Sequence, residues 1–415
     1  MKVLRLRTGC RLHFGLMELA AKEPLQYAGL GLMLDQPGFE LSFASAELPA
    51  GDSLLDDSIA IAITVDASEV ELPGESNRSD SAELKLEYEH RMAAVARRQL
   101  TLARETSATP IPACHIRLIR GLPMHSGLGA GTQLACAVAT GIDLFARGRQ
   151  PSKSVGASHV ESSIAGSSVA EISPSNREAS QGSQTSVADG WCSVLGTQPP
   201  ISAEWLTQAA GRGLRSAIGL FGFLHGGLIL DEGYAVDAAH DASARNTVCH
   251  SVRPLAAQKA SIASTWRCVL IVPQHRQAVS GAKETEWMAE LGSLPNPRRN
   301  DMLALAQKAF SLAPHSRRFA DFTGCLDQYM ELAGQLFSRY QGGLYNGQDV
   351  ATAVDCARRV GLRGIGQSSW GPTVFGFAET PALAQQYAAQ LTDLRPEWCV
   401  RVATPAAQAA QYRWQ

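Results

Sequence analysis

The stretch Pro123-Met124-His125-Ser126-Gly127-Leu128-Gly129-Ala130-Gly131-Thr132-Gln133-Leu134 is a glycine-rich turn that runs directly into an apolar segment ending near Phe145. The apolar spacing of that segment predicts a helix that begins in the turn. Glycines let backbone N–H groups approach a phosphate closely, and the helix dipole adds about half a positive charge at that end. The stretch therefore predicts a loop that binds a diphosphate or triphosphate, with a ligand-free glycine-rich helix start as the alternative. The candidate phosphate ligands are Gly127, Leu128, Gly129, Ala130, Gly131, Thr132 and Gln133.

A second candidate segment is Arg11-Leu12-His13-Phe14-Gly15-Leu16, near the start of the chain. Residues two apart on an extended chain point to the same face, so Arg11 and His13 share a face. Two cationic donors on one face suit a phosphate or a carboxylate. An edge strand with solvated polar residues explains the same pattern equally well.

Residues 211–227 form a third candidate segment, with two arginines, one histidine, two phenylalanines and six glycines. Arginine binds carboxylate or phosphate through paired hydrogen bonds, and phenylalanine stacks on an arene, although both phenylalanines could equally be core residues. Few purely structural loops need this mixture, so the segment predicts part of a substrate pocket. Its candidate residues are Arg212, Arg215, Ser216, Phe221, Phe223 and His225.

Residues 364–374, Gly-Ile-Gly-Gln-Ser-Ser-Trp-Gly-Pro-Thr-Val, form a fourth candidate segment. A turn between a helix and a strand would need only the glycines. The side chains of Gln367, Ser368, Ser369 and Trp370 in addition predict a lined ligand pocket. Val374 to Phe377 is expected to continue as a strand.

Composition limits the classes of protein that this chain can represent. It has 415 residues, of which 45% are hydrophobic and 18% charged, and this predicts two globular domains of ordinary size. A formal net charge of -2 argues against a nucleic-acid binder. Nine scattered cysteines without a C-x-x-C pair predict free thiols in the cytoplasm. Neither a signal peptide nor a membrane-spanning apolar run is expected.

Hydrophobic periodicity predicts an α+β chain. Strands are expected within residues 1–43, at 115–119, 268–272 and 399–402, and helices at 82–104, 301–312, 326–340, 350–360 and 383–391. Residues 45–81 read as irregular, 364–371 as a turn, and the serine-rich residues 152–186 as a mobile insertion. These elements predict one domain over residues 1–260 and a second over residues 261–415.

The phosphate loop P-x-x-x-G-L-G-x-G-T resembles that of the GHMP kinase superfamily, normally P-x-x-x-G-L-G-S-S-A, with Ala130 and Gly131 in place of the two serines. The resemblance implies a two-domain α+β fold, in which a ribosomal protein S5 domain 2-like domain precedes a ferredoxin-like domain. In the sugar kinases of the superfamily an aspartate receives the proton of the acceptor hydroxyl. Gly219 stands at that position here, and a glycine cannot act as a general base.

Taken together, the four segments resemble the family of beta-ribofuranosylaminobenzene 5'-phosphate synthases, non-kinase members of that superfamily. The resemblance runs from Arg11 to about Val374 and fails in the two irregular stretches. It implies condensation of phosphoribosyl pyrophosphate with 4-aminobenzoate, with loss of carbon dioxide and pyrophosphate, an early step toward tetrahydromethanopterin-type carriers. Magnesium is implied and an organic cofactor is not.

The resemblance also implies roles for individual residues. The loop from Gly127 to Thr132 would hold pyrophosphate, Arg11 and His13 substrate anions, and Arg215 and His225 the arene carboxylate or the ribose phosphate. Metal ligands cannot be assigned, since the acidic residues near the motifs could equally be solvated or structural. A homodimer is plausible. The alternatives are an ATP-dependent small-molecule kinase of the same fold and a sensor that binds a phosphorylated metabolite without turnover.

Overall fold

The computed structural model describes residues 2–18, 27–46, 61–65, 78–105, 111–148, 190–213, 216–233, 257–273, 282–291 and 296–415. Two predictions therefore lie outside the described residues, namely the mobile insertion at 152–186 and the role of Arg215. No helix in the described ranges combines the length and apolar character needed to cross a membrane.

The first domain is built on a sheet whose strands, within the described residues, follow the order β3-β4-β2-β1-β12-β5, with β6 and β7 attached at β2. Its centre is the long antiparallel pair β1–β2, in which the alternating side chains of Leu4 and Leu6 are fully buried. The strands are β1 (Leu4–Leu16), β2 (Gly29–Ser45), β3 (Ile61–Val65), β4 (Cys114–Arg120), β5 (Cys192–Ser193), β6 (Leu228–Asp231), β7 (Ala257–Ala260) and β12 (Gln411–Trp414).

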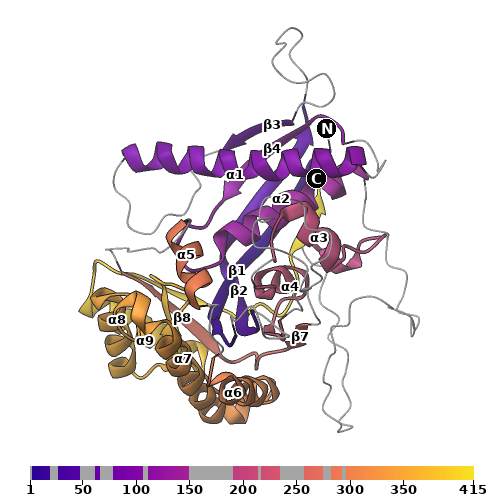
Figure 1. Ribbon diagram of the computed structural model, residues 1–415. Coiled ribbons are helices and arrows are strands. Elements are labelled where there is room, and N and C mark those ends of the chain that lie inside the picture. Colours follow the sequence, from indigo (N-terminus) through magenta and orange to yellow (C-terminus); the bar gives the residue numbers. More distant parts are fainter. Residues whose placement is uncertain are drawn as a thin grey trace.

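Among the described residues, four α-helices accompany this sheet, and α2 lies at their centre. It packs on β1 and β2 and is flanked by α1, α3 and α4 (Figure 1). The nearly continuous apolar sequence of α2 suits this position, since most of its residues are buried. The helices are α1 (Arg78–Glu105), α2 (Ala130–Ala146), α3 (Ala203–Ala210) and α4 (Ile218–His225).

The second domain carries a four-stranded antiparallel sheet in the order β11-β8-β10-β9. Along the chain, β8 is followed by helices, then by β9 and β10, then by α9 and β11, which is the ferredoxin-like arrangement. Its elements are β8 (Arg267–Val272), α5 (Ala282–Leu291), α6 (Arg299–Leu312), α7 (Phe319–Gln341), α8 (Gln348–Val360), β9 (Arg363–Gln367), β10 (Val374–Ala378), α9 (Pro381–Leu394) and β11 (Cys399–Ala403). The predicted α+β class is confirmed.

The predicted domain boundary at residue 260 stays a prediction, and strand pairing departs from it at the end of the chain. After β11 the chain returns to the first domain, where β12 pairs with β1 in the register Leu4↔Trp414 and Leu6↔Tyr412. The first sheet is therefore continued beyond β1 by residues far from it in sequence. The contact of α7 with β1 adds a second connection between the two domains.

The structure corrects three of the element predictions. Residues 61–65, read as irregular, form β3 and pair in parallel with β4. Residues 218–225, read as part of a loop, form the helix α4, whose glycines fit between Thr132 and Met33. Residues 363–367, read as a turn, form β9, and the turn itself begins at Ser368. In each case pairing or packing with a distant segment decides the conformation.

Candidate active site

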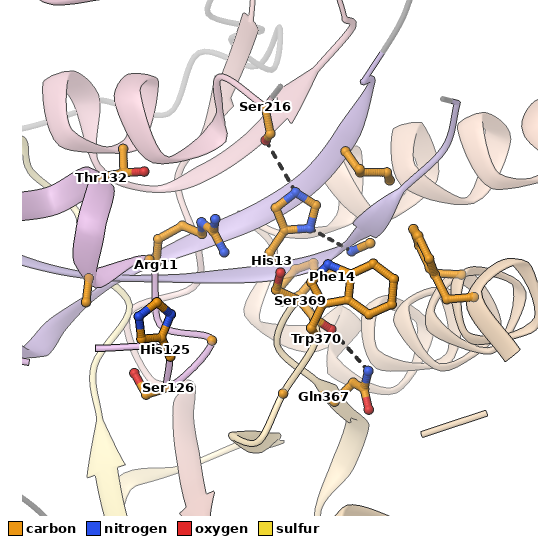
Figure 2. A pocket seen from close by; sticks show the side chains of 18 of the residues that line it. Arg11, His13, Phe14, His125, Ser126, Thr132, Ser216, Gln367, Ser369 and Trp370 are labelled. Carbon is orange, nitrogen blue, oxygen red and sulfur yellow. Dashed lines mark hydrogen bonds between the residues drawn. The ribbon is translucent and has the colours of Figure 1, made fainter. Parts of the chain in front are cut away.

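A cavity of about 850 Å³ opens between the phosphate loop, β1 and the second domain (Figure 2). Polar and cationic groups gather at one side, and apolar side chains from β1, α5 and α7 at the other. The lining residues include Arg11, His13, Phe14, Arg91, His125, Ser126, Gly127, Gly129, Ala130, Gly131, Thr132, Arg212, Ser216, Met288, Met330, Phe337, Gln341, Tyr345, Gln367, Ser369 and Trp370. The structure thus brings together residues from all four of the sequence segments.

The beginning of α2 forms the basic side of the cavity. Gly129 precedes the helix in the left-handed conformation (φ 73°), and the first turn of the helix carries no acidic residue. A Cβ on Gly131 would lie 3.5 Å from both the Nη2 of Arg212 and the Nη1 of Arg91. Arg11 approaches from β1, with its Nε 3.2 Å from the position of a Cβ on Gly129. Three guanidinium groups and a helix N-terminus therefore converge, an arrangement suited to a multiply charged anion.

Aromatic rings form the apolar side of the cavity. The ring of Trp370 packs edge-on against Phe337 at a centroid distance of 4.8 Å, and in a tilted orientation against Trp287 at 5.5 Å. Phe14 contributes from β1, where its ring lies 5.2 Å from that of Phe375. A flat aromatic molecule would fit such a wall. Trp370 was predicted as a pocket residue from the sequence, and it lines the cavity.

His13 is held neutral by its surroundings. Burial and the nearby Arg11 guanidinium lower the pKa of His13 well below its ordinary value. Its Nδ1 accepts a hydrogen bond from the backbone N–H of Gly15 at 3.2 Å, so the ring hydrogen is on Nε2, which faces the Ser216 hydroxyl at 3.3 Å (Figure 2). The prediction of a cationic imidazole is therefore wrong, because desolvation disfavours the charge. In this tautomer His13 donates to Ser216 and cannot activate its hydroxyl as a nucleophile.

The turn after β9 fastens the second domain to the phosphate loop. The Ser368 hydroxyl donates to the carbonyl oxygen of Gly127 at 2.8 Å and accepts from the backbone N–H of His13 at 3.0 Å. The Thr373 hydroxyl donates to the carbonyl oxygen of Ser126 at 2.7 Å. Both side chains are fully buried. Ser368, predicted to face the pocket, therefore joins the backbone segments around it.

Replacing Thr373 with valine should lower the free energy of unfolding by about 1–3 kcal/mol, because the carbonyl of Ser126 would lose a buried donor. Urea denaturation measures this effect. The matched control is Ser311→Ala, which removes an exposed hydroxyl bonded to the carbonyl of Lys308 and should change stability by about 0.5 kcal/mol or less. Equal changes in the free energy of unfolding for the two variants would mean that the hydrogen bond from Thr373 to Ser126 contributes nothing to stability.

Besides Ser368, four more predicted site residues lie outside the cavity lining. Gln133 is fully buried, accepts from the Thr8 hydroxyl at 2.8 Å and donates to the Gly219 carbonyl at 2.8 Å. The side chain of Leu128 is buried in the core. Phe221 and Phe223 also belong to the core, because α4 buries its apolar side chains against the sheet. The predicted roles of Gln133, Phe221 and Phe223 are corrected to structural ones, whereas phosphate binding by the backbone N–H of Leu128 stays a prediction.

His225 is also placed away from the cavity. It ends α4, where its ring stacks on Phe221 at a centroid distance of 6.2 Å. Burial, together with the charge of Lys259, lowers the pKa of His225 to about 4. His225 is not among the described residues that line the cavity. The predicted contact with a carboxylate or phosphate is therefore corrected.

Acidification should test the burial of His225. The unfolded chain takes up a proton near pH 6.5 whereas the folded chain does so near pH 4, so stability is lost as the pH falls through this window. Between pH 7 and pH 5, the free energy of unfolding of His225→Gln should fall by about 1–2 kcal/mol less than that of the natural protein. Urea unfolding at each pH measures this difference. Asp231, whose pKa burial raises to about 6, acts in the opposite direction but equally in both proteins. Parallel pH profiles would contradict the assignment.

The carboxylates near the motifs have structural partners. Asp231 accepts from the backbone N–H groups of Ala217 at 2.7 Å and Gly233 at 3.0 Å, and thereby fixes the start of α4. Glu18 accepts from the backbone N–H of Asn296, and Asp35 from that of Thr404. No aspartate or glutamate is among the described residues that line the cavity. A Cβ on Gly219 would lie 3.0 Å from the Thr132 methyl, so the packing of α4 on α2 leaves little room for a carboxylate there.

The described residues do not form a metal site of their own. They contain no group of three histidine, cysteine, aspartate or glutamate side chains placed to bind a metal ion. Magnesium prefers oxygen ligands and is commonly bound by one or two carboxylates together with substrate phosphates. The donor set that the structure describes does not fit a protein-bound magnesium, and the predicted ion stays a prediction.

Comparison with known proteins defines the class to which the fold belongs. The chain superposes with a TM-score of 0.55 on the Lin0012 protein of Listeria innocua, at 10% identity and with 99% of each chain covered. It superposes with a TM-score of 0.51 on mevalonate pyrophosphate decarboxylase of Streptococcus pyogenes, at 10% identity and with 98% and 97% of the two chains covered. The fold is that of the GHMP kinases, as predicted.

A relative is also found by sequence. The chain is 24% identical over 378 residues to beta-ribofuranosylphenol 5'-phosphate synthase of Methanothermobacter thermautotrophicus, across 91% of this chain and 89% of the relative. No protein-family model matches the chain. The chain is therefore similar, at a distance, to a synthase named for a phosphorylated riboside of a phenol.

Proposed function

We propose that this protein is a decarboxylating C-riboside synthase that joins the phosphoribosyl group of phosphoribosyl pyrophosphate to 4-aminobenzoate. The observation that carries the proposal is a phosphate loop surrounded by three arginines, with no carboxylate in the described lining and an aromatic wall beyond it. The distant likeness to a ribofuranosylphenol phosphate synthase supports the same reaction type.

The reaction can proceed without a nucleophile from the protein. The bond between ribose C1 and the pyrophosphate oxygen breaks, and its electron pair leaves with pyrophosphate. The ring carbon that bears the carboxylate attacks C1, and the electrons of the broken carbon-carboxylate bond restore the aromatic ring as carbon dioxide departs. Arg11, Arg91 and Arg212 would stabilise the negative charge that develops on the leaving group, and the aromatic wall would orient the arene.

The far side of the cavity suits a hydrogen-bond donor on the arene. The Nε2 of Gln367 donates to the Oε1 of Gln341 at 3.0 Å and to the carbonyl oxygen of Ser369 at 3.1 Å, which uses both hydrogens. Its Oε1 accepts from the backbone N–H of Asn346 at 2.8 Å and keeps one lone pair. The substituent para to the carboxylate would therefore be a donor, which an amino group and a hydroxyl group both are.

The geometry argues against a kinase. The kinases of this fold use a carboxylate as the base for the departing proton, and the described lining of the cavity holds none; the Nδ1 of His13 already accepts from Gly15, which leaves the imidazole of His125 as the histidine base in that lining. A sensor without turnover would need the anion site but not the aromatic wall. The structure therefore favours the synthase over both alternatives.

The proposal is tested by incubating the purified protein with phosphoribosyl pyrophosphate, Mg²⁺ and carboxyl-labelled 4-aminobenzoate, and counting released carbon dioxide. Labelled 4-hydroxybenzoate runs in parallel, because the name of the relative contains a phenol. Release of carbon dioxide from 4-hydroxybenzoate alone would make that compound the aromatic substrate and would still support the proposed reaction type. Consumption of ATP with a sugar alcohol, without carbon dioxide release, would identify a kinase, and the absence of both activities would favour a sensor.

A further inference from the structure

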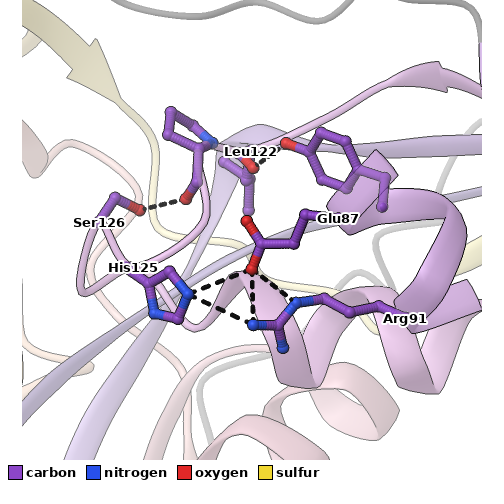
Figure 3. A network of polar contacts seen from close by, with 7 residues as sticks. Glu87, Arg91, Leu122, His125 and Ser126 are labelled. Atoms are coloured by element: carbon purple, nitrogen blue, oxygen red, sulfur yellow. Dashed lines mark hydrogen bonds and ion pairs between the residues drawn. The ribbon is translucent and has the colours of Figure 1, made fainter. Parts of the chain in front are cut away.

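Helix α1 reaches the phosphate loop through a small polar network (Figure 3). The Nε and Nη2 of Arg91 donate to the Oε1 of Glu87 at 2.9 and 2.7 Å, one helical turn apart. The Nε2 of His125, in the phosphate loop, lies 3.2 Å from the same oxygen. The same nitrogen lies 3.3 Å from the Nη2 of Arg91, so the imidazole contacts both members of the ion pair. One carboxylate oxygen therefore joins the helix to the loop.

This network leaves one edge of the Arg91 guanidinium directed at the cavity. With Nε and Nη2 facing Glu87, the remaining Nη1 lies 3.5 Å from the position of a Cβ on Gly131, next to the Nη2 of Arg212. Arg91 lines the cavity, whereas Glu87 lies behind it and is not among the lining residues. The carboxylate thus fixes the arginine without presenting its own charge to an anion in the cavity.

The backbone of His125 requires this attachment. Its φ is +58°, a left-handed conformation that residues with a side chain rarely adopt. The hydrogen bond to Glu87 and the adjacent bond from the Ser126 hydroxyl to the Pro123 carbonyl, at 2.8 Å, hold the turn (Figure 3). In addition, the Tyr88 hydroxyl donates to the Leu122 carbonyl just before the loop. Helix α1 is therefore bound to the loop at two neighbouring points.

We propose that Arg91 binds the pyrophosphate group of the substrate and that Glu87 is the positioning residue that aims it. This inference rests on the proposed function, since it assigns a ligand to the same phosphate loop. None of the four sequence segments contains either residue. The arginine gains its place through the packing of α1 on α2, with Glu87 one turn before it on the same helix.

The test is calorimetric titration of the protein with inorganic pyrophosphate, at two salt concentrations, for the natural protein, Arg91→Met, Arg91→Lys, Glu87→Ala and Arg97→Met. We expect Arg91→Met to weaken binding about 10- to 30-fold and to reduce its salt dependence. The affinity of Arg91→Lys should lie between those of the natural protein and Arg91→Met, because an ammonium group keeps the charge but not the paired N–H donors of a guanidinium. Arg97, on an exposed face of α1, is the matched control and should leave binding unchanged.

The sign of the effect of Glu87→Ala decides the positioning role. A carboxylate that acted only through its charge would, once removed, let the anion bind more tightly. A carboxylate that aims Arg91 would, once removed, weaken binding about 3- to 10-fold, and this is the expected result. His125→Asn should give a smaller loss, because asparagine tolerates the left-handed backbone.

Two outcomes would overturn the inference in distinguishable ways. If Arg91→Met binds pyrophosphate as Arg97→Met does, or if Glu87→Ala binds it more tightly, the role of this network fails while the proposed synthase stands. If the natural protein itself does not bind pyrophosphate, the proposed function fails together with the inference.

Discussion

Arg11→Met should lower kcat/KM for phosphoribosyl pyrophosphate about 10²- to 10³-fold, which is about 3–4 kcal/mol of transition-state stabilisation. Arg11 lies on β1 beside Gly129, where the leaving group would gain negative charge. Methionine keeps the approximate volume and the apolar stem of the side chain and removes only the charged guanidinium group. The measurement is the rate of labelled carbon dioxide release at several concentrations of phosphoribosyl pyrophosphate.

Arg97→Met again provides the control, since its side chain is exposed on α1. A thermal melt of both variants separates a damaged site from a damaged fold. If Arg11→Met reacted as fast as the control, Arg11 would have no part in binding the leaving group. If the substitution raised only the KM for the aromatic substrate, Arg11 would instead bind that substrate.

Gly127→Ala should destabilise the protein by about 3 kcal/mol or more and abolish activity. A Cβ at this position would lie 2.4 Å from the carbonyl oxygen of Ser368 and 2.8 Å from that of Gly371, and the φ of Gly127 is +82°. The clash falls on backbone atoms, which cannot move without opening the contact between the second domain and the phosphate loop. Urea denaturation measures the loss.

Gly342→Ala is the matched control for the conformational part of this effect. Gly342 has nearly the same φ, +77°, but a Cβ there would meet nothing within 4 Å. Its replacement should cost about 1–2 kcal/mol, the penalty of a left-handed backbone alone. Equal losses for the two variants would mean that the contact between Gly127 and the turn after β9 is looser than the structure shows.

Much of the fold could be predicted from the sequence. The apolar periodicity of residues 301–312 and 350–360 predicted helices that the structure places at Arg299–Leu312 and Gln348–Val360. The strand predicted at 268–272 is observed at Arg267–Val272. When apolar residues recur with a clear helical or strand period, the local sequence alone indicates which face is buried. These predictions are confirmed for that reason. The strand at 61–65 was missed, since its signal is its pairing with β4.

The site was predicted in outline and not in detail. Arg11, His13, Arg212 and Trp370 line one cavity with the phosphate loop, as the four segments indicated. Arg91 was missed, because an arginine on the polar face of a predicted amphipathic helix is ordinarily solvated. Ser368 and Gln133 have polar side chains within motifs, yet both form hydrogen bonds with groups of distant segments instead of facing the cavity.

By itself the sequence determined the phosphate loop, the α+β class and the places of most helices and strands, because each depends on neighbouring residues and their backbone preferences. Only the tertiary structure decided that β12 joins the first sheet beside β1, that Arg91 joins Arg212 beside α2, and that His13 is neutral. Such features depend on which distant segments pack together and on how far each charge is removed from water. Neither quantity can be read from the spacing of residues along the chain.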